Sequence, residues 1–258
     1  MLRKCILYVA GAASIALALG TAACDKSSDE PKPGPATRRA ATRAKPTTAP
    51  AKRNIELVEL DIGLEPDAVT RATPGLPKGL KPPHLRAEGK QRAAFMVTPG
   101  MKNLAIYKTV TAREKPVVGD VDQITDGIKK SGKFDYVEFS QAGWVQIDLG
   151  GQRTIHAVVI WHFYKNATIY SDVIVRLADD EACTRNVRTL FNNDHDNSSA
   201  MGQGADKAFY TRWWGEIVDA RGENHAGTPA RYVRVYTGAG WEGEPPRFVE
   251  ISVYGKER

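Results

Sequence analysis

Cysteine is scarce in this chain, with 3 among 258 residues. So few cysteines exclude a small domain held together by several disulfides. The remaining composition, with 42% hydrophobic and 26% charged residues, 23 Gly and 15 Pro, is that of an ordinary globular protein. It excludes collagen, a coiled coil and a polytopic membrane protein.

Aromatic residues are almost absent from the first third of the chain. Of the 21 Phe, Tyr and Trp residues, one is Tyr8 and the other 20 lie within residues 95–258. A core that buries large rings therefore has to be formed by residues 95–258.

An excess of basic residues is also missing from that part of the chain. Residues 1–55 hold 10 Lys and Arg against 3 Asp and Glu, which leaves 26 against 27 in residues 56–258. The net charge of +6 therefore belongs to the N-terminal segment. Nucleic-acid binding requires basic residues clustered on the folded domain, so the charge distribution argues against a nucleic-acid partner.

The N-terminus has the pattern of an export signal. Arg3 and Lys4 precede an uncharged run of apolar and small residues from Cys5 to Ala23. Small residues directly before Cys24 resemble a bacterial lipoprotein signal peptide of residues 1–24, with Cys24 as the lipidated residue. An uncleaved single-span anchor and ordinary cleavage after Ala23 are the alternatives. We expect an exported, membrane-anchored lipoprotein, in the periplasm or at the cell surface.

Residues 25–94 have no pattern that could form a domain. Residues 25–54 are rich in Pro, Ala, Lys and Arg, and their five prolines prevent a helix or ladder from propagating. They predict a disordered tether. Residues 55–62 alternate like one strand, but further prolines follow, so we expect residues 55–94 to pack loosely on the domain or not at all. With Cys5 removed and Cys24 lipidated, Cys183 has no disulfide partner.

The rest of the chain has a period of two. Residues 144–149 alternate, and Gly150-Gly151 predicts a turn at their end. Residues 155–163 are nearly all apolar, which predicts a central strand covered on both sides. Further alternating stretches are found at 173–177, 232–236 and 248–255, and no stretch of similar length has a helical period. Residues 95–258 therefore predict an all-β domain, an antiparallel β-sandwich.

Five short segments carry a resemblance to a known family. They are Asn103-Leu104-Ala105, Thr125-Asp126-Gly127, and residues 144–150, 230–236 and 250–255. In this order they resemble the discoidin domain, or coagulation factor 5/8 C-terminal type, where that family overlaps with family 32 carbohydrate-binding modules. The resemblance covers residues 100–255. It implies a non-catalytic, galactose-binding-like jelly-roll β-sandwich whose loops at one end hold a ligand.

The resemblance also implies a structural calcium site. Carried over by position, the ligands are the Asp126 carboxylate, the carbonyl oxygens of Gln123 and Ile128, the Ser131 hydroxyl and Glu250. A plain Asp-Gly turn with an exposed Glu250 is the alternative.

A long polar loop is the second candidate site. Asn193, Asp194, His195 and Asp196 lie in a run of hydrogen-bonding residues that ends at Ser199. These side chains could bond sugar hydroxyls, or Asp194, Asp196 and Ser198 could ligate a second calcium ion. A loop stiffened by Asx-turns is the alternative.

The third candidate is a set of aromatic and polar residues near strand ends, of the kind that bind sugars by stacking and hydrogen bonding. It consists of His162, Tyr164, Asn166, Trp241 and Arg247. We expect Trp241 and Tyr164 to be partly exposed, and Trp144 and Trp161 to lie in the core.

Enzyme signatures are missing: no Gly-x-Ser-x-Gly, His-Glu-x-x-His, phosphate-binding Gly loop or zinc-type Cys pair is found. The sequence predicts a non-catalytic, surface-tethered module that binds a glycan or another cell-surface polymer, anchored to the membrane through Cys24. A protein–protein adhesion or scaffold module is the alternative. A glycan-active hydrolase is the third hypothesis.

Overall fold

The computed structural model describes residues 55–64, 83–87, 92–166 and 168–257. The predicted signal peptide with Cys24 and the tether up to residue 54 lie outside these ranges, as do residues 65–82 and 88–91 of the predicted loose segment. Among the described residues, no helix has the length and apolar character of a membrane span.

Strands make up nearly all the regular structure of the described residues. They are β1 (Val58–Glu59), β2 (Met96–Val97), β3 (Lys102–Asn103), β4 (Val110–Ala112), β5 (Val137–Glu138), β6 (Gly143–His162), β7 (Ile174–Ala178), β8 (Arg188–Asn192), β9 (Glu216–Asp219), β10 (Thr228–Thr237) and β11 (Arg247–Lys256). The described helices are short 3₁₀ turns: η2 (Val121–Thr125), η3 (Glu223–His225) and η4 (Trp241–Gly243). All pairs between these strands are antiparallel, so the predicted all-β antiparallel fold is confirmed.

The longest strand, β6, belongs to both layers of the sandwich. Its first part pairs with β4 and β10, and its second part pairs with β9 and β11 and, over residues 153–155, still with β10. Between the two parts, residues 149–152 face only Arg231 of β10, and Gly150 has a φ of +77°. This wide bulge bends the strand without reversing it. The turn predicted at Gly150-Gly151 is therefore wrong, because one bent strand continues there.

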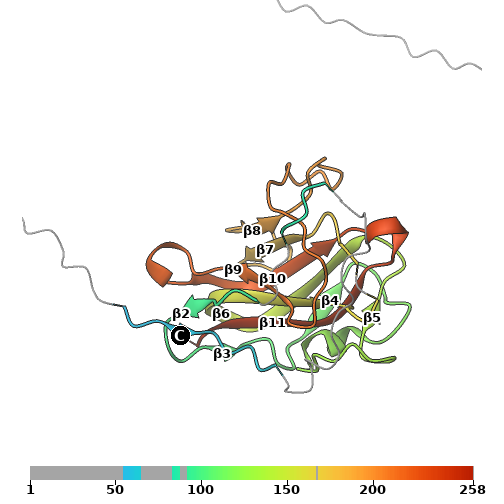
Figure 1. Ribbon diagram of the computed structural model, residues 1–258. Coiled ribbons are helices and arrows are strands. Elements are labelled where there is room, and N and C mark those ends of the chain that lie inside the picture. The colour runs from blue at the N-terminus through green and yellow to red at the C-terminus, as the bar shows by residue number, and fades with distance from the viewer. Residues whose placement is uncertain (1–54, 65–82, 88–91, 167, 258) are drawn as a thin grey trace, which may run out of the picture. The chain divides into compact units, whose positions relative to one another are not determined.

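A hydrophobic core fills the space between the layers. Val145 and Val233 face it from one layer, and Val158 and Ile251 face it from the other, each at most 1% exposed. Figure 1 shows the strands that supply most of these side chains, β10, β6 and β11, side by side. The alternation seen in the sequence therefore places one side of each strand against this core.

The outer face of the second part of β6 is covered by another apolar cluster. Val159 and Trp161 pack there with Leu60 and Ile62, which are 2% and 1% exposed. The Leu60 N–H also donates to the Phe95 carbonyl over 2.8 Å. The prediction that residues 155–163 are covered on both sides is thus confirmed. The expectation of loose packing is wrong for residues 55–64, because two of their side chains complete this cluster.

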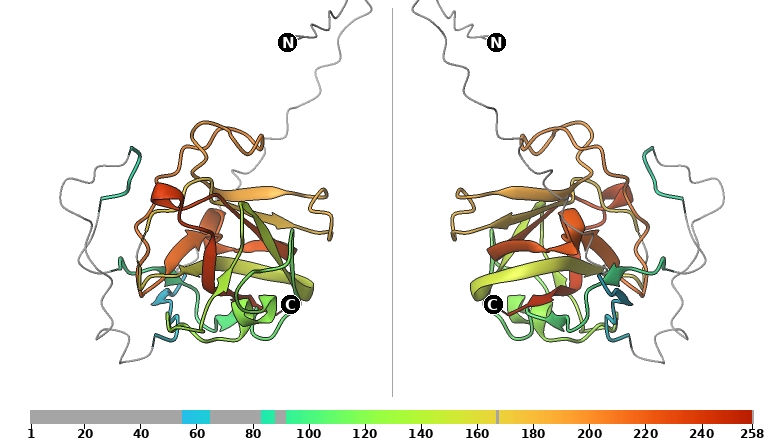
Figure 2. Two further views of the ribbon diagram at one scale, coloured as in Figure 1. Left: turned by 90° about the vertical axis from the view of Figure 1, so that its right-hand side faces the viewer. Right: turned by 90° about the vertical axis from the view of Figure 1, so that its left-hand side faces the viewer.

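The predicted polar loop, residues 193–206, lies at one end of the sandwich, beside the segment 83–87 (Figure 2). Leu85 forms an isolated bridge with Ala208. The Arg86 N–H donates to the Ala208 carbonyl over 2.8 Å, and the Ala208 N–H donates to the His84 carbonyl over 3.0 Å. The segment 83–87, more than a hundred residues before this loop in the sequence, is therefore held next to it by backbone hydrogen bonds.

Candidate functional site

The polar loop is organised around Asp194, which is 0% exposed. Its carboxylate accepts the backbone N–H groups of Ser198 and Ser199, each over 3.0 Å, and the hydroxyl of Ser199. Burial acts to raise the pKa of Asp194, but the hydrogen bonds from Ser199 and Ser198 outweigh it and lower the pKa. The side chain predicted to bind ligand is therefore the internal support of the loop.

Asn193 joins this loop to the segment before β7. Its amide donates to the Tyr170 carbonyl over 3.1 Å, and its oxygen accepts the Val173 N–H over 2.7 Å. Both ends of the buried side chain are thus paired within the protein. Asn193 fixes the position of the loop against β7.

A cleft of about 590 Å³ opens between this loop, η4 and the segment 83–87. Its lining residues are Pro83, His84, Ile169, Ser171, Asp172, Asn193, His195, Asp196, Ala208, Gly240 and Trp241. The structure therefore brings together four of the residues predicted to bind ligand, Asn193, His195, Asp196 and Trp241. Trp241 is 40% exposed, as predicted, and its backbone N–H donates to the Ile169 carbonyl over 2.8 Å.

Two histidines stack at this cleft. The rings of His84 and His195 lie 3.8 Å apart between centroids, with an interplanar angle of 21°. His195 Nε2 is buried and has no hydrogen-bond partner within the described residues. Sequence reasoning missed His84 because it lies in a proline-rich segment before the predicted domain, and the Leu85–Ala208 bridge brings it beside His195.

Three carboxylates gather beside the cleft. One oxygen of each of Asp172, Asp194 and Asp196 lies within 4.8 Å of the others. Burial, followed by the charge of Asp194, raises the pKa of Asp172. Oxygen ligands at such spacing can bind a hard cation, and exposed carboxylates can also accept hydrogen bonds from sugar hydroxyls. Asp172 was missed by the sequence analysis because it precedes β7, twenty-two residues before Asp194.

The other predicted ligand residues are not among those that line the cleft. His162 is 2% exposed and stacks on Tyr170 and Phe248, with centroids 4.3 and 5.0 Å away. Burial lowers the pKa of His162 to about 3, so the ring is neutral at physiological pH. It lies against the core because it continues the inward-facing side of β6 opposite Phe248.

Tyr164 is only 2% exposed, so the expected partial exposure is wrong. Its hydroxyl donates to the Lys129 carbonyl over 2.9 Å and also accepts the Ser131 N–H. Arg247 is half-buried and bonded to Glu138 and Glu244 at 2.6 and 2.7 Å, while Asn166 is exposed. For the core tryptophans, Trp161 is fully buried as predicted, whereas Trp144 is only partly buried.

The structure brings only some of the predicted calcium ligands close to one another. The loop after η2 lies against β11, where the Gly127 N–H donates to Glu250 Oε2 over 3.1 Å. Glu250 is 0% exposed, so the alternative of an exposed Glu250 is wrong. Burial raises the pKa of Glu250 to about 8, and the nearby Asp126 charge adds to the rise. Burial also raises the pKa of Asp126, and a bound cation would stabilise two such acidic groups in their ionised form.

The remaining members of that set have other partners. The Ser131 hydroxyl oxygen accepts the N–H groups of Tyr164 and Lys165, each over 3.2 Å. The Gln123 side chain closes a capping box with Asp120, where its oxygen accepts the Asp120 N–H over 2.7 Å. The Ile128 N–H donates to Asp126 Oδ1 over 2.8 Å. Of the predicted calcium ligands, the structure therefore brings the acidic side chains of Asp126 and Glu250 close enough for the charge of Asp126 to act on Glu250.

Asp194→Asn is expected to destabilise the polar loop. An amide NH₂ cannot accept the hydrogen bonds from Ser199, so buried donors lose their partner, at a cost of about 1–3 kcal/mol in the free energy of unfolding. Chemical denaturation and limited proteolysis between residues 193 and 206 measure the effect. Asp196→Asn is the control, because Asp196 is exposed and accepts only the Ser198 N–H among the bonds described. Equal effects of the two variants would contradict the supporting role of Asp194.

No family model matches the sequence, and no curated protein is significantly similar to it. Three solved structures are among those similar to the chain. A chitosan-binding module of a chitosanase/glucanase from Paenibacillus sp. IK-5 is 18% identical, covering 60% of this chain and 99% of that chain, with a TM-score of 0.39. A fucose-binding module of Streptococcus pneumoniae is 14% identical, covering 60% and 99%, with a TM-score of 0.42. A family 32 carbohydrate-binding module of Clostridium perfringens, in complex with GlcNAc-α-1,4-galactose, is 14% identical, covering 65% and 100%, with a TM-score of 0.43. The last of these three belongs to family 32 of the carbohydrate-binding modules, which the sequence also resembles.

Proposed function

We propose that this protein is a non-catalytic module that binds carbohydrate in the cleft between Trp241 and the stacked histidines. The observation that carries the proposal is a partly exposed tryptophan at the rim of a cleft whose other side chains are mainly polar. A sugar ring presents an apolar C–H face to an aromatic ring and its hydroxyls to planar polar groups. Trp241 supplies the aromatic ring, and Asp172, Asp196 and His195 supply the polar groups.

The fixed parts of the cleft favour binding without reorganisation. Asp194 and Asn193 hold the loop from inside, and the backbone of Trp241 is bonded to Ile169. Preorganised walls reduce the entropy that a ligand would otherwise cost on binding. His195 Nε2 would gain a hydroxyl partner when a sugar is bound.

Trp241→Ala is expected to weaken glycan binding about fivefold without lowering the stability of the domain, since stacking on an aromatic ring contributes about 1 kcal/mol. An array of neutral glycans selects the probe, and titration calorimetry on the full-length protein measures Kd. Phe134→Ala is the control, because Phe134 is 70% exposed and lies outside the cleft. If Trp241→Ala binds the glycan with the same Kd as the wild type, the carbohydrate site is not at Trp241.

A protein-binding role is the second candidate. Ile106, Tyr107 and Ile128 are 37%, 79% and 45% exposed, and a Cβ at Gly127 would lie 3.1 Å from Ile106 Cδ1. Exposed apolar side chains gathered around one turn are typical of protein contacts. If the array retains no glycan at millimolar concentration while the immobilised protein captures a cell-surface protein, and Tyr107→Ala abolishes the capture, the adhesion role replaces ours.

We also propose a structural calcium ion at Asp126 and Glu250, and attachment to the membrane through a lipid on Cys24. A bound cation would neutralise the buried carboxylate and hold the loop after η2 against β11. The lipid proposal rests on the sequence alone. Metabolic labelling with palmitate tests it: the wild type is expected to be labelled, and Cys24→Ala is not.

A further inference from the structure

The cleft of the proposed function, which we name the Trp241 cleft, adjoins a cleft of about 550 Å³ with Trp144 in its wall, the Trp144 cleft. Asp172 lines both clefts. The segments 193–201 and 237–241 also contribute lining residues to both. Each cleft has a volume typical of a small-molecule site, about 300–1,000 Å³. Together they form one groove along the polar loop, with Asp172 at the junction.

The Trp144 cleft contains an aromatic pair. Trp144 of β6 and Tyr236 of β10 are cross-strand partners, and both are half-buried and line the cleft. Their neighbours Val145 and Val235 face the core, 1% and 0% exposed, so the alternation of the strands turns the two rings to the outer face of the sheet. Arg113, which is exposed in the same lining, adds guanidinium donors. A sugar unit can therefore pack here as it can on Trp241.

Two guanidinium groups hold these rings in place. Arg234 lies 4.2 Å from the centroid of the Trp144 ring, and Arg176 lies 5.8 Å from the centroid of Tyr236. Arg176 Nη2 also donates to the Met201 carbonyl over 2.9 Å, which joins the polar loop to the sheet. The aromatic wall and the loop wall of the Trp144 cleft are thus linked through contacts within the protein, so binding there requires little reorganisation.

The junction of the two clefts is also fixed by the backbone. Asp172 has a φ of +55°, a left-handed conformation that aspartate adopts more readily than most residues. Gly238 leaves room for its side chain, because a Cβ there would lie 2.8 Å from Asp172 Oδ2. The Gly238 N–H donates to the Ser171 carbonyl over 3.1 Å. The Asp172 carboxylate is therefore held at the junction, where it can accept a hydrogen bond from a sugar hydroxyl.

The charge at the junction favours a neutral ligand. Asp172, Asp194 and Asp196 each place one carboxylate oxygen within 4.8 Å of the others. An anionic sugar unit would meet like charges here, which is unfavourable. The hydroxyls of a neutral sugar can instead donate to Asp172 and to the exposed Asp196. A neutral glycan is therefore the occupant that fits.

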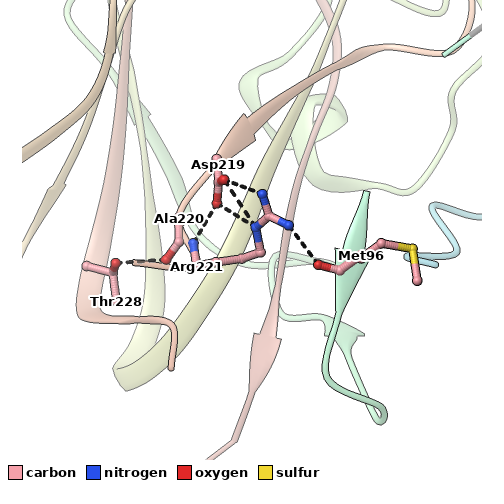
Figure 3. A network of polar contacts seen from close by, with 5 residues as sticks. All are labelled: Met96, Asp219, Ala220, Arg221 and Thr228. Atoms are coloured by element: carbon pink, nitrogen blue, oxygen red, sulfur yellow. Dashed lines mark hydrogen bonds and ion pairs between the residues drawn. The ribbon is translucent and has the colours of Figure 1, made fainter. Parts of the chain in front are cut away.

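A third cleft, of about 410 Å³ around Phe95, does not continue this groove. None of the described residues in its lining also lines the Trp241 cleft or the Trp144 cleft. The Arg221 guanidinium packs against Phe95, 4.0 Å from the ring centroid. Figure 3 shows that this guanidinium already donates to Asp219 and to the Met96 carbonyl. A chain that leaves the Trp241 cleft is therefore expected to pass Asp172 and not to enter the cleft around Phe95.

From this arrangement we propose that the carbohydrate site continues from the Trp241 cleft past Asp172 into the Trp144 cleft, so that its ligand is an extended chain of neutral sugars and not a single terminal sugar. One unit of the chain stacks on Trp241, and a later unit packs on Trp144 and Tyr236. This inference rests on the proposed function, because the Trp241 cleft is one half of the site.

Titration calorimetry on the full-length protein compares the monomer with the β-1,4-linked hexamer of N-acetylglucosamine, glucose, mannose and galactose. Concentrations are counted in sugar units, so that a longer chain gains nothing by offering more units. In at least one series the hexamer is expected to bind about fivefold or more tightly than the monomer, because it makes a second aromatic contact. Equal affinity of monomer and hexamer in every series, or no binding in any series at millimolar concentration, would overturn the extended site. The glycan array decides the proposed function separately.

Variants locate the second half of the site. Trp144→Ala is expected to weaken hexamer binding about fivefold and to leave the Kd of the monomer unchanged, whereas Trp241→Ala weakens both. Trp214→Ala is the matched control, because Trp214 is also half-buried but lines the cleft around Phe95. If Trp144→Ala lowers the melting temperature, the exposed Arg113 is replaced by Ala instead, with the same expected loss. A hexamer that keeps its wild-type Kd in both variants, or that is weakened by Trp214→Ala alone, would refute the extension into the Trp144 cleft.

Discussion

Replacing Glu250 with Gln is expected to stabilise the calcium-free protein at alkaline pH, by on the order of 3 kcal/mol in the free energy of unfolding. Burial raises the pKa of Glu250 from 4.5 to about 8. Between these values the folded protein keeps a proton that the unfolded chain has released. The free energy of unfolding therefore falls as the pH rises from about 4.5 to 8, and Gln, which has no such proton, removes this part of the fall.

The measurement is chemical denaturation from pH 4 to 9 in the presence of a chelator. The two proteins should differ little near pH 4, where the glutamate is protonated in both states, and most near pH 9. Glu223→Gln is the control, since Glu223 is exposed in η3. A variant that is less stable than the wild type at every pH would show that the ionised carboxylate is satisfied by its Gly127 and Ser252 contacts.

Calcium is expected to reverse this order if the proposed ion binds. A cation beside Glu250 favours the ionised carboxylate, so added calcium should raise the melting temperature of the wild type at pH 8 and leave Glu250→Gln unchanged. Asp126→Asn should weaken the calcium response as well. A wild type that does not respond to calcium would refute the ion while leaving the pH prediction intact.

The second large effect is expected from Ile62→Ala, which should lower the free energy of unfolding by about 2–4 kcal/mol. Ile62 is 1% exposed and packs in the cluster that covers the outer face of β6. Truncation leaves a cavity against Trp161 and its neighbours that the surrounding strands can only partly close. Urea denaturation measures the loss.

Ile55→Ala is the matched control, because Ile55 is 43% exposed in the same segment. Its expected change is below about 0.5 kcal/mol. Equal, small effects of both variants would mean that residues 55–64 do not support the fold. If the prediction holds, a fragment that begins at residue 95 lacks Leu60 and Ile62 and exposes part of the core, so binding studies require the longer chain.

The strands after residue 95 could be predicted because their signal is local. Val145, Ile147 and Leu149 alternate with polar neighbours, and this alternation is enough to assign a half-buried strand. The same reasoning failed at Gly150, because a glycine pair permits a turn and a bulge equally well. The backbone forms a bulge there because β6 pairs with β10 on both sides of the glycine pair.

The sequence predicted only part of the candidate site, because a local pattern does not show which side chains face the interior. A run of polar residues from Asn193 to Ser199 marked the loop, but its sequence does not say which side chains turn inward. Asp194 turned inward because the N–H groups of Ser198 and Ser199 needed an acceptor. His162 was misplaced because both faces of β6 are apolar there, so the pattern could not tell the core from the surface.

By itself, the sequence determined the all-β architecture and the polar loop that lines the cleft, since each follows from residues close together in the chain. Only the tertiary structure decided that His84 reaches the cleft, that Asp172 joins Asp194, and that Leu60 and Ile62 cover β6. These contacts join residues twenty to more than a hundred positions apart, and their energies come from burial and hydrogen bonding that exist only once the strands have paired.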